Sequence, residues 1–229
     1  MLLVGHSGVG KTVLVEGILN ALDPLNSSFV VNFSAGSSSE GLQMMIESQY
    51  DRRAKNKFKP KNSKLKAVCF IDDLNMPRKD EFGSQPPLEL IRQHIDYGFW
   101  YSRTSAQVTK NYICDLQMLS AMGKPGGGRA EISNRLLSQF HVINYTIPSE
   151  MNMKHIFKTI VDIKFQKFNE EIRQQCEPLA VATIQLFNQL SENFLPTPTK
   201  SHYVFNMRDI SKVFQGMYKV ENDFYESKE

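Results

Sequence analysis

The sequence predicts an α/β unit over residues 1–148, with a parallel sheet flanked by helices, followed by a small all-helical unit over residues 149–229. A short apolar run, a glycine-rich turn and a helical pattern follow one another over residues 2–22, which indicates strand, turn and helix. The unbroken apolar run AVCFI at residues 67–71 is typical of a parallel strand covered on both faces. Beyond these elements the apolar spacing becomes helical only, so we expect the boundary near Pro148.

The composition is that of a globular chain. Of the 229 residues, 41% are hydrophobic and 22% are charged, which is enough for two packed units. The net charge of +3 is too small and too dispersed to indicate nucleic acid, and we expect the basic run at residues 52–66 to be a solvated loop. No apolar run approaches the ~20 residues of a membrane-spanning helix, so no membrane contact is expected. The first residues also lack the features of a signal peptide.

Cysteine and histidine usage predicts neither a disulfide framework nor a metal centre. Cys69, Cys114 and Cys176 lie far apart and are odd in number, which indicates a reducing, intracellular setting. The five histidines show no ligand spacing, so we expect each on the surface or in packing and predict no zinc site.

The elements after the first helix follow from local signals. The turn at residues 23–24 ends that helix, and FVVNF at residues 29–33 predicts the second strand. Ser37 and Glu40 stand at capping-box spacing and open a helix that is expected to run toward Arg53. The basic loop then leads to the buried strand.

The rest of the α/β unit continues the alternation. Pro86 can open a helix and Gly98 can stop it. The aromatic run at residues 99–101 is expected to be a strand packed into the core rather than a surface that stacks a base. The remaining predicted elements are a strand within residues 112–122, a turn at residues 124–129, a helix at residues 134–140 and a last strand at residues 141–146.

The second unit has no convincing strand. Helical apolar spacing is found at residues 151–168, 179–194 and 207–220. Methionine and phenylalanine side chains at helical spacing are expected to be core rather than a cofactor pocket: Met44, Met45, Phe157, Phe165 and Phe168.

The glycine-rich turn carries a complete phosphate-binding pattern. The pattern G-x-x-x-x-G-K-T is matched by Gly5, His6, Ser7, Gly8, Val9, Gly10, Lys11 and Thr12. Glycines let backbone N–H groups surround phosphate oxygens, Lys11 supplies a cation, and Thr12 can ligate magnesium at a helix N-terminus. The flanking strand and helix favour a nucleotide site over a chance glycine-rich turn.

Two acids follow the buried strand at the expected carboxyl edge of the sheet. Asp72 is the candidate partner of magnesium, and Asp73 is the candidate that polarises the attacking water. Without the phosphate loop, a solvated strand end would explain both acids. Most hydrolases of this architecture carry Glu at the second position, and Asp73 is one methylene shorter, so we expect slow turnover.

Five segments together resemble one protein family. They are the phosphate loop, FIDDLNMP at residues 70–77, GSQPPLELIRQ at residues 83–93, AMGKPGGGR at residues 121–129 and HYVFNMRD at residues 202–209. Together they look like the third AAA+ module of an axonemal dynein heavy chain of the inner-arm type. The resemblance covers essentially the whole chain and implies a P-loop AAA+ large subdomain, a helical lid subdomain, and ring neighbours formed by tandem modules of one long chain. The family's segment before the phosphate loop, which helps to enclose adenine, is absent from this sequence.

The resemblance also implies roles for two arginines. Arg208 matches the lid arginine that leans over the nucleotide, although an ion pair with an acid at a helix start would also explain it. Arg135 matches the first arginine of the family's R-F-L-R-H-F, a candidate finger for the neighbouring module's site, with an ordinary surface arginine as the alternative. Ser138 replaces the second arginine, and Met122-Gly123 stand where a polar sensor is usual, which weakens the case for brisk hydrolysis.

The function implied is a regulatory site that binds ATP or ADP with magnesium and whose nucleotide state gates the principal motor site. The expected partners are neighbouring AAA+ modules, with other axonemal dynein subunits and microtubules reached through the rest of the chain. The expected location is the cytoplasm and cytoskeleton, in the axoneme of a cilium or flagellum. Two alternatives remain, a free-standing AAA+ remodelling ATPase that forms homo-oligomers and a structural module that has lost nucleotide.

Overall fold

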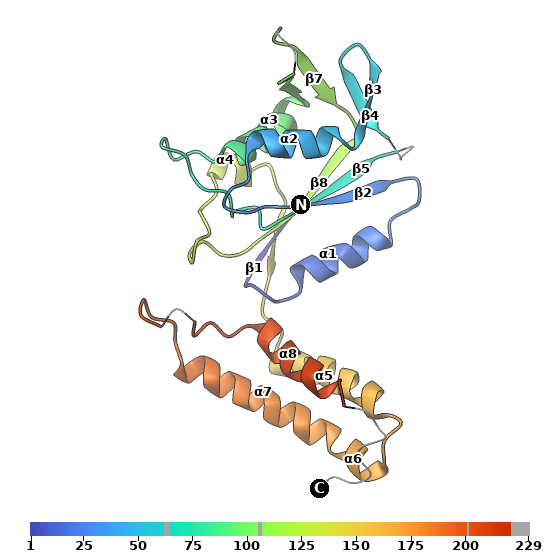
Figure 1. The fold of residues 1–229 in the computed structure, drawn as a ribbon, viewed down its shortest axis with the longest axis vertical. Coiled ribbons are helices and arrows are strands. Elements are labelled where there is room, and N and C mark those ends of the chain that lie inside the picture. The colour runs from blue at the N-terminus through green and yellow to red at the C-terminus, as the bar shows by residue number, and fades with distance from the viewer. Residues whose placement is uncertain (62–64, 105–106, 201, 221–229) are drawn as a thin grey trace. The chain divides into compact units, whose positions relative to one another are not determined.

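The computed structural model describes residues 1–61, 65–104, 107–200 and 202–220. Contacts divide the chain into two compact units, one made of Met1–His6 and Gly10–Tyr145 and the other of Ser7–Val9 and Thr146–Glu229. Figure 1 shows a sheet with helices in the first unit and helices alone in the second. Within the described ranges, no helix combines the length and the apolar character that crossing a membrane requires.

A five-stranded parallel sheet forms the centre of the first unit. Its order is β2-β5-β8-β1-β9, with every neighbouring pair parallel. The bounds of these strands are β1 Leu2–Gly5, β2 Ser27–Asn32, β5 Ala67–Asp72, β8 Leu116–Met122 and β9 Val142–Tyr145. The carboxyl ends of parallel strands meet at one edge, so the loops after β1, β5 and β8 lie together.

Helices cover both faces of this sheet (Figure 1). The side chains of β5 pack alternately against the helices on one face and on the other. Val68 and Phe70 pack in one cluster with α1 (Lys11–Asn20). Ala67, Cys69 and Ile71 pack in another cluster, with residues of α2 (Ser39–Glu47) and α3 (Pro86–Tyr97). Successive side chains of a strand point to opposite faces, so this one strand contributes to two cores. The prediction of a parallel sheet flanked by helices is confirmed.

A second, four-stranded sheet was not predicted. Its order is β3-β4-β7-β6, with bounds β3 Tyr50–Ala54, β4 Lys57–Pro60, β6 Phe99–Tyr101 and β7 Lys110–Ile113. The expectation of a solvated loop at residues 52–66 is therefore wrong over β3 and β4, while residues 62–64 lie outside the described residues. The strand at residues 99–101 is confirmed, and Trp100 is buried as expected.

The helix predicted from Ser37 toward Arg53 is shorter. Ser38 is the N-cap, and its side chain accepts a hydrogen bond from the Gly41 N–H at 3.0 Å. The helix ends at Glu47 because the chain then enters β3. Met44 and Met45 are more than half exposed, so their assignment to the core is wrong.

Other elements of the first unit agree with the sequence. Helix α3 ends at Gly98, whose φ of 73° is the left-handed conformation of a helix stop. The helix expected at residues 134–140 is present as the shorter α4 (Asn134–Leu137), and β9 is the predicted last strand.

The second unit has its own core. Its helices are α5 Glu150–Phe165, α6 Glu170–Gln174, α7 Cys176–Asn193 and α8 Met207–Met217, of which only the short α6 was missed. The Phe157 and Phe214 rings stack with centroids 4.5 Å apart, and Ala180 and Ile184 of α7 complete the packing. Phe157 and Phe168 are buried as predicted.

Candidate functional site: a phosphate loop beside two acids

The phosphate loop joins β1 to α1. Gly8 and Gly10 have φ values of 79° and 100°, which side chains with a Cβ rarely adopt. Gly10 is the N-cap residue of α1, and no described side chain caps that helix, so its first N–H groups are available to an anion. Between Gly5 and Gly10, His6 is exposed and Val9 is buried, while Ser7 completes the turn.

The Lys11 ammonium lies against the loop itself. Lys11 Nζ donates to Gly5 O at 2.9 Å and to His6 O at 2.7 Å, and the residue is 8% exposed. A buried cation that is held by carbonyl oxygens can exchange those acceptors for the oxygens of an anion. The loop therefore holds a cation at the end of β1, where the sequence predicted a phosphate site.

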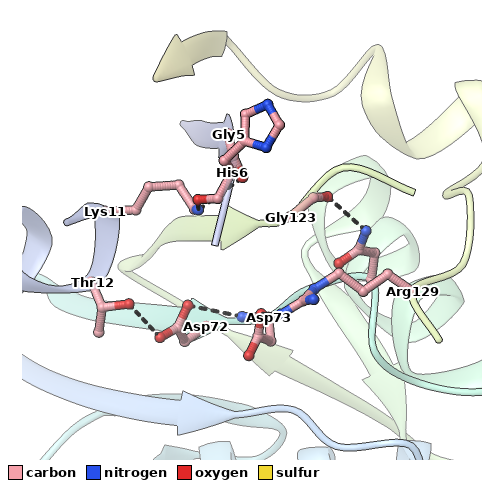
Figure 2. A network of polar contacts seen from close by, with 9 residues as sticks. Gly5, His6, Lys11, Thr12, Asp72, Asp73, Gly123 and Arg129 are labelled. Atoms are coloured by element: carbon pink, nitrogen blue, oxygen red, sulfur yellow. Dashed lines mark hydrogen bonds and ion pairs between the residues drawn. The ribbon is translucent and has the colours of Figure 1, made fainter. Parts of the chain in front are cut away.

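Thr12 and Asp72, the two predicted magnesium partners, are in contact. Thr12 Oγ1 donates to Asp72 Oδ2 at 2.7 Å, which joins the start of α1 to the end of β5 across 60 residues of sequence (Figure 2). Hydroxyl and carboxylate oxygens are the ligands that magnesium prefers. The pair therefore fits a magnesium ion held together with phosphate at the loop.

Asp73 is bound by a residue that the sequence reasoning missed. Arg129 NH2 lies 3.1 Å from Asp73 Oδ1, and the Asp73 N–H donates to Asp72 Oδ1 at 2.9 Å. Figure 2 shows the Arg129 guanidinium beside Asp73. Asp73 has a φ of 53°, a conformation that is uncommon outside glycine. The sequence predicts a turn at residues 124–129, but no local pattern assigns Arg129 a role at the site.

The two arginines implied by the resemblance lie in different units. Arg135 is exposed in α4, and Ser138 Oγ donates to the Arg135 carbonyl at 2.9 Å. Arg208 is exposed at the start of α8, and its N–H donates to Asn206 Oδ1 at 2.8 Å. Within the described part of the chain Arg208 makes no ion pair, whereas Asp209 forms the capping box with Asn206.

Two family models match this chain. One, described as the P-loop containing dynein motor region, matches residues 1–148, and the other, described as the dynein heavy chain ATPase lid domain, matches residues 153–229.

Similar curated proteins are much longer than this chain. The chain is 48% identical to dynein axonemal heavy chain 2 of Homo sapiens over 229 residues, covering 100% of this chain and 5% of that protein. It is 46% identical over 229 residues to the dynein-1-beta heavy chain, flagellar inner arm I1 complex, of Chlamydomonas reinhardtii, covering 100% of this chain and 5% of that protein. For dynein axonemal heavy chain 6 of Homo sapiens the identity is 40% over 225 residues, covering 96% of this chain and 5% of that protein. The chain thus spans about 5% of the length of these relatives.

Proposed function

The chain belongs to the dynein heavy-chain family, and on this premise we propose that it is a nucleotide-binding AAA+ module of an axonemal dynein motor. It binds Mg-ATP or Mg-ADP at the phosphate loop, hydrolyses ATP slowly and regulates the main motor site. Its neighbours are other AAA+ modules of the heavy chain, and the whole motor acts on microtubules in the axoneme of a cilium or flagellum. Its place as the third module rests on the motifs at residues 70–77 and 121–129.

The observation that carries the proposal is the convergence of Lys11, Thr12 and Asp72 at the carboxyl edge of the sheet. Lys11 Nζ lies on the loop carbonyls, and 2.7 Å separates the Thr12 and Asp72 oxygens at the start of α1. In the proposed complex the loop N–H groups hold the phosphates, Lys11 turns to them, and Thr12 with Asp72 holds magnesium. Bound magnesium neutralises the charge that develops on the phosphates.

Slow hydrolysis follows from the position assigned to the water-activating acid. Asp73 reaches one methylene less far than Glu, and its carboxylate is engaged by Arg129 at 3.1 Å. Arg208 is proposed to contact the nucleotide from the lid, and Arg135 to serve the neighbouring module as a finger, because a planar guanidinium stabilises spread phosphate charge. This division of roles suits a site that reports its nucleotide state more than one that turns over quickly.

The test is thermal unfolding of the 229-residue chain with and without saturating Mg-ADP or Mg-ATP. A ligand that binds only the native state raises the melting temperature. At a ligand concentration of about 100 times the dissociation constant, it stabilises the folded chain by about 2.7 kcal/mol. We expect a rise of several degrees that is lost in Lys11→Ala. The exposed-lysine variant Lys124→Ala is the matched control and is expected to keep the full rise. If neither nucleotide raised the melting temperature of the unmodified chain, the proposed nucleotide site would be refuted.

A further inference from the structure

The loop that carries Arg129 has a backbone that favours glycine at three consecutive positions. Gly126, Gly127 and Gly128 have φ values of 114°, 59° and 88°. Gly126 and Arg129 close the turn, since Gly126 N–H donates to Arg129 O at 2.9 Å and Arg129 N–H donates to Gly126 O at 3.1 Å. The chain therefore reverses direction within four residues and returns Arg129 toward the end of β8.

Gly123 leaves the space that the Arg129 side chain fills. A Cβ placed on Gly123 would lie 2.7 Å from both Cδ and Nε of Arg129, closer than such atoms approach. Any other residue at this position would displace the guanidinium. Arg129 thus occupies the space, directly after β8, that a side chain at position 123 would take.

Asn75 ties this loop to the segment that carries the acids. The residue is fully buried, its side-chain Nδ2 donates to Gly123 O at 2.9 Å, and its backbone carbonyl accepts from the Ala130 N–H at 3.0 Å. Asn75 therefore holds both ends of the loop, two residues after Asp73. A shift of the segment that carries Asp73 would therefore also shift the loop that carries Arg129.

The loop also lies next to the phosphate loop. In the register of the sheet Met122 pairs with Val4, so Gly123 stands beside Gly5, whose carbonyl binds Lys11. On its other side β8 pairs with β5, which ends at Asp72 and is followed directly by Asp73. Gly123, against which the Arg129 side chain packs, therefore lies between the phosphate loop and the strand that leads to Asp73.

The guanidinium has hydrogen-bonding capacity left at this place. One nitrogen faces Asp73 at 3.1 Å, while the buried Nε of Arg129 has no hydrogen-bond partner among the described residues. The two side chains are 25% and 44% exposed, for Arg129 and Asp73 respectively, so an incoming anion can reach both. A planar guanidinium donates well to phosphate oxygens, and a buried unpaired donor is costly.

We propose that Arg129 is the phosphate sensor of this site and distinguishes a nucleoside triphosphate from a diphosphate. Without a terminal phosphate the guanidinium holds the Asp73 carboxylate. With one, it donates to the phosphate oxygens and releases the carboxylate toward the attacking water. The inference rests on the proposed function, because it takes the phosphate loop to hold a nucleotide.

The experiment compares the dissociation constants of Mg-ADP and of a magnesium-bound non-hydrolysable ATP analogue by isothermal titration calorimetry of the 229-residue chain. Arg129→Ala is expected to weaken binding of the analogue about tenfold and to leave Mg-ADP within about twofold, because one charge-assisted contact is lost. Asp73→Asn is expected to act in the opposite direction and strengthen binding of the analogue several-fold, because it removes the competing carboxylate. Arg129→Lys, which keeps the charge without the planar fork, should lie between Arg129→Ala and the unmodified chain.

Each other outcome has a distinct meaning. Lys124→Ala removes a cation from the same loop and should leave the ratio of the two constants unchanged. If Arg129→Ala left the ratio unchanged, or weakened both ligands equally while Mg-ADP still bound the unmodified chain, the sensor role would be refuted and the nucleotide site would stand. If the unmodified chain bound neither ligand, the proposed function would fall and the sensor role with it.

Discussion

His94 is a buried histidine that burial keeps uncharged at neutral pH. The residue is 8% exposed, its ring centroid lies 5.4 Å from that of Trp100, and its Nδ1 has no hydrogen-bond partner among the described residues. Burial lowers the pKa of His94 from 6.5 to about 4. The native chain therefore resists protonation at a pH where the unfolded chain accepts a proton.

Acidification is expected to destabilise the chain through this residue. Between the pKa of about 4 in the folded state and about 6.5 in the unfolded state, the unfolded chain binds more protons, so stability falls as the pH drops through that range. The His94 contribution to the loss at pH 5 relative to pH 7 is roughly 2 kcal/mol. Urea unfolding at both pH values should show that loss reduced in His94→Gln and retained in the exposed-residue control His141→Gln. If His94→Gln lost as much stability between pH 7 and pH 5 as the unmodified chain, other titratable groups would be responsible for the loss.

The phosphate loop and the two acids could be predicted because each is local in sequence. Eight consecutive residues form the loop, and Asp72-Asp73 directly follow an apolar run. Arg129 could not be predicted in the same way, since it meets Asp73 across 56 residues and only through a turn with three positive φ values. Asn75 holds that turn in place by donating a hydrogen bond to Gly123 O and accepting one from the Ala130 N–H, and no local pattern encodes these bonds.

At the scale of elements, Glu47 joins the second sheet to α2. Its Oε1 accepts hydrogen bonds from Trp100 Nε1 at 2.7 Å, Gln43 Nε2 at 3.0 Å and Asn111 Nδ2 at 3.2 Å. These donors come from β6, α2 and β7. One carboxylate thus fixes the helix and two strands of the second sheet together.

Removing this carboxylate is expected to loosen the second sheet. Glu47→Ala leaves Trp100 Nε1 and Asn111 Nδ2 without this acceptor, while Gln43 Nε2 keeps its bond to Tyr101 O, and should destabilise the chain by roughly 2 to 3 kcal/mol. Trp100 is the only tryptophan, so its emission should also shift to longer wavelength as water reaches the ring. Glu40→Ala, an exposed position of the same helix, is the control and should change stability by less than about 0.5 kcal/mol. Unchanged emission and stability in Glu47→Ala would show that packing alone holds the sheet.

The strands of the second sheet explain where element prediction failed. In β3 only Tyr50 is buried, and the residues after it are charged or small, so no alternation of apolar side chains marks a strand. Its neighbour β4 pairs with β7, which lies some fifty residues further along the chain. Such pairing depends on the assembled sheet, whereas β5 and α3 carry their own apolar signals and were predicted.

For the whole molecule, the proposed function predicts a monomer. Ring neighbours of this module are proposed to be other modules of the same long heavy chain, so its ring-facing surfaces are expected to fit those modules rather than a second copy of itself. Size-exclusion chromatography with light scattering should give a mass near 26.2 kDa with and without Mg-ATP. A nucleotide-dependent ring of this chain would instead favour the free-standing homo-oligomeric ATPase.

The glycine turn before Arg129 has a consequence for inherited variation in the gene. Gly126, Gly127 and Gly128 are exposed, and a Cβ added to any of them would meet nothing within 4 Å. Burial and steric crowding alone would therefore predict that substitutions at these positions are tolerated. Every missense change there nevertheless adds that Cβ to a left-handed backbone, which strains the turn that positions Arg129. We therefore expect missense changes at these three positions to weaken the contact between Arg129 and Asp73, and changes at the exposed Lys124 to leave that contact intact.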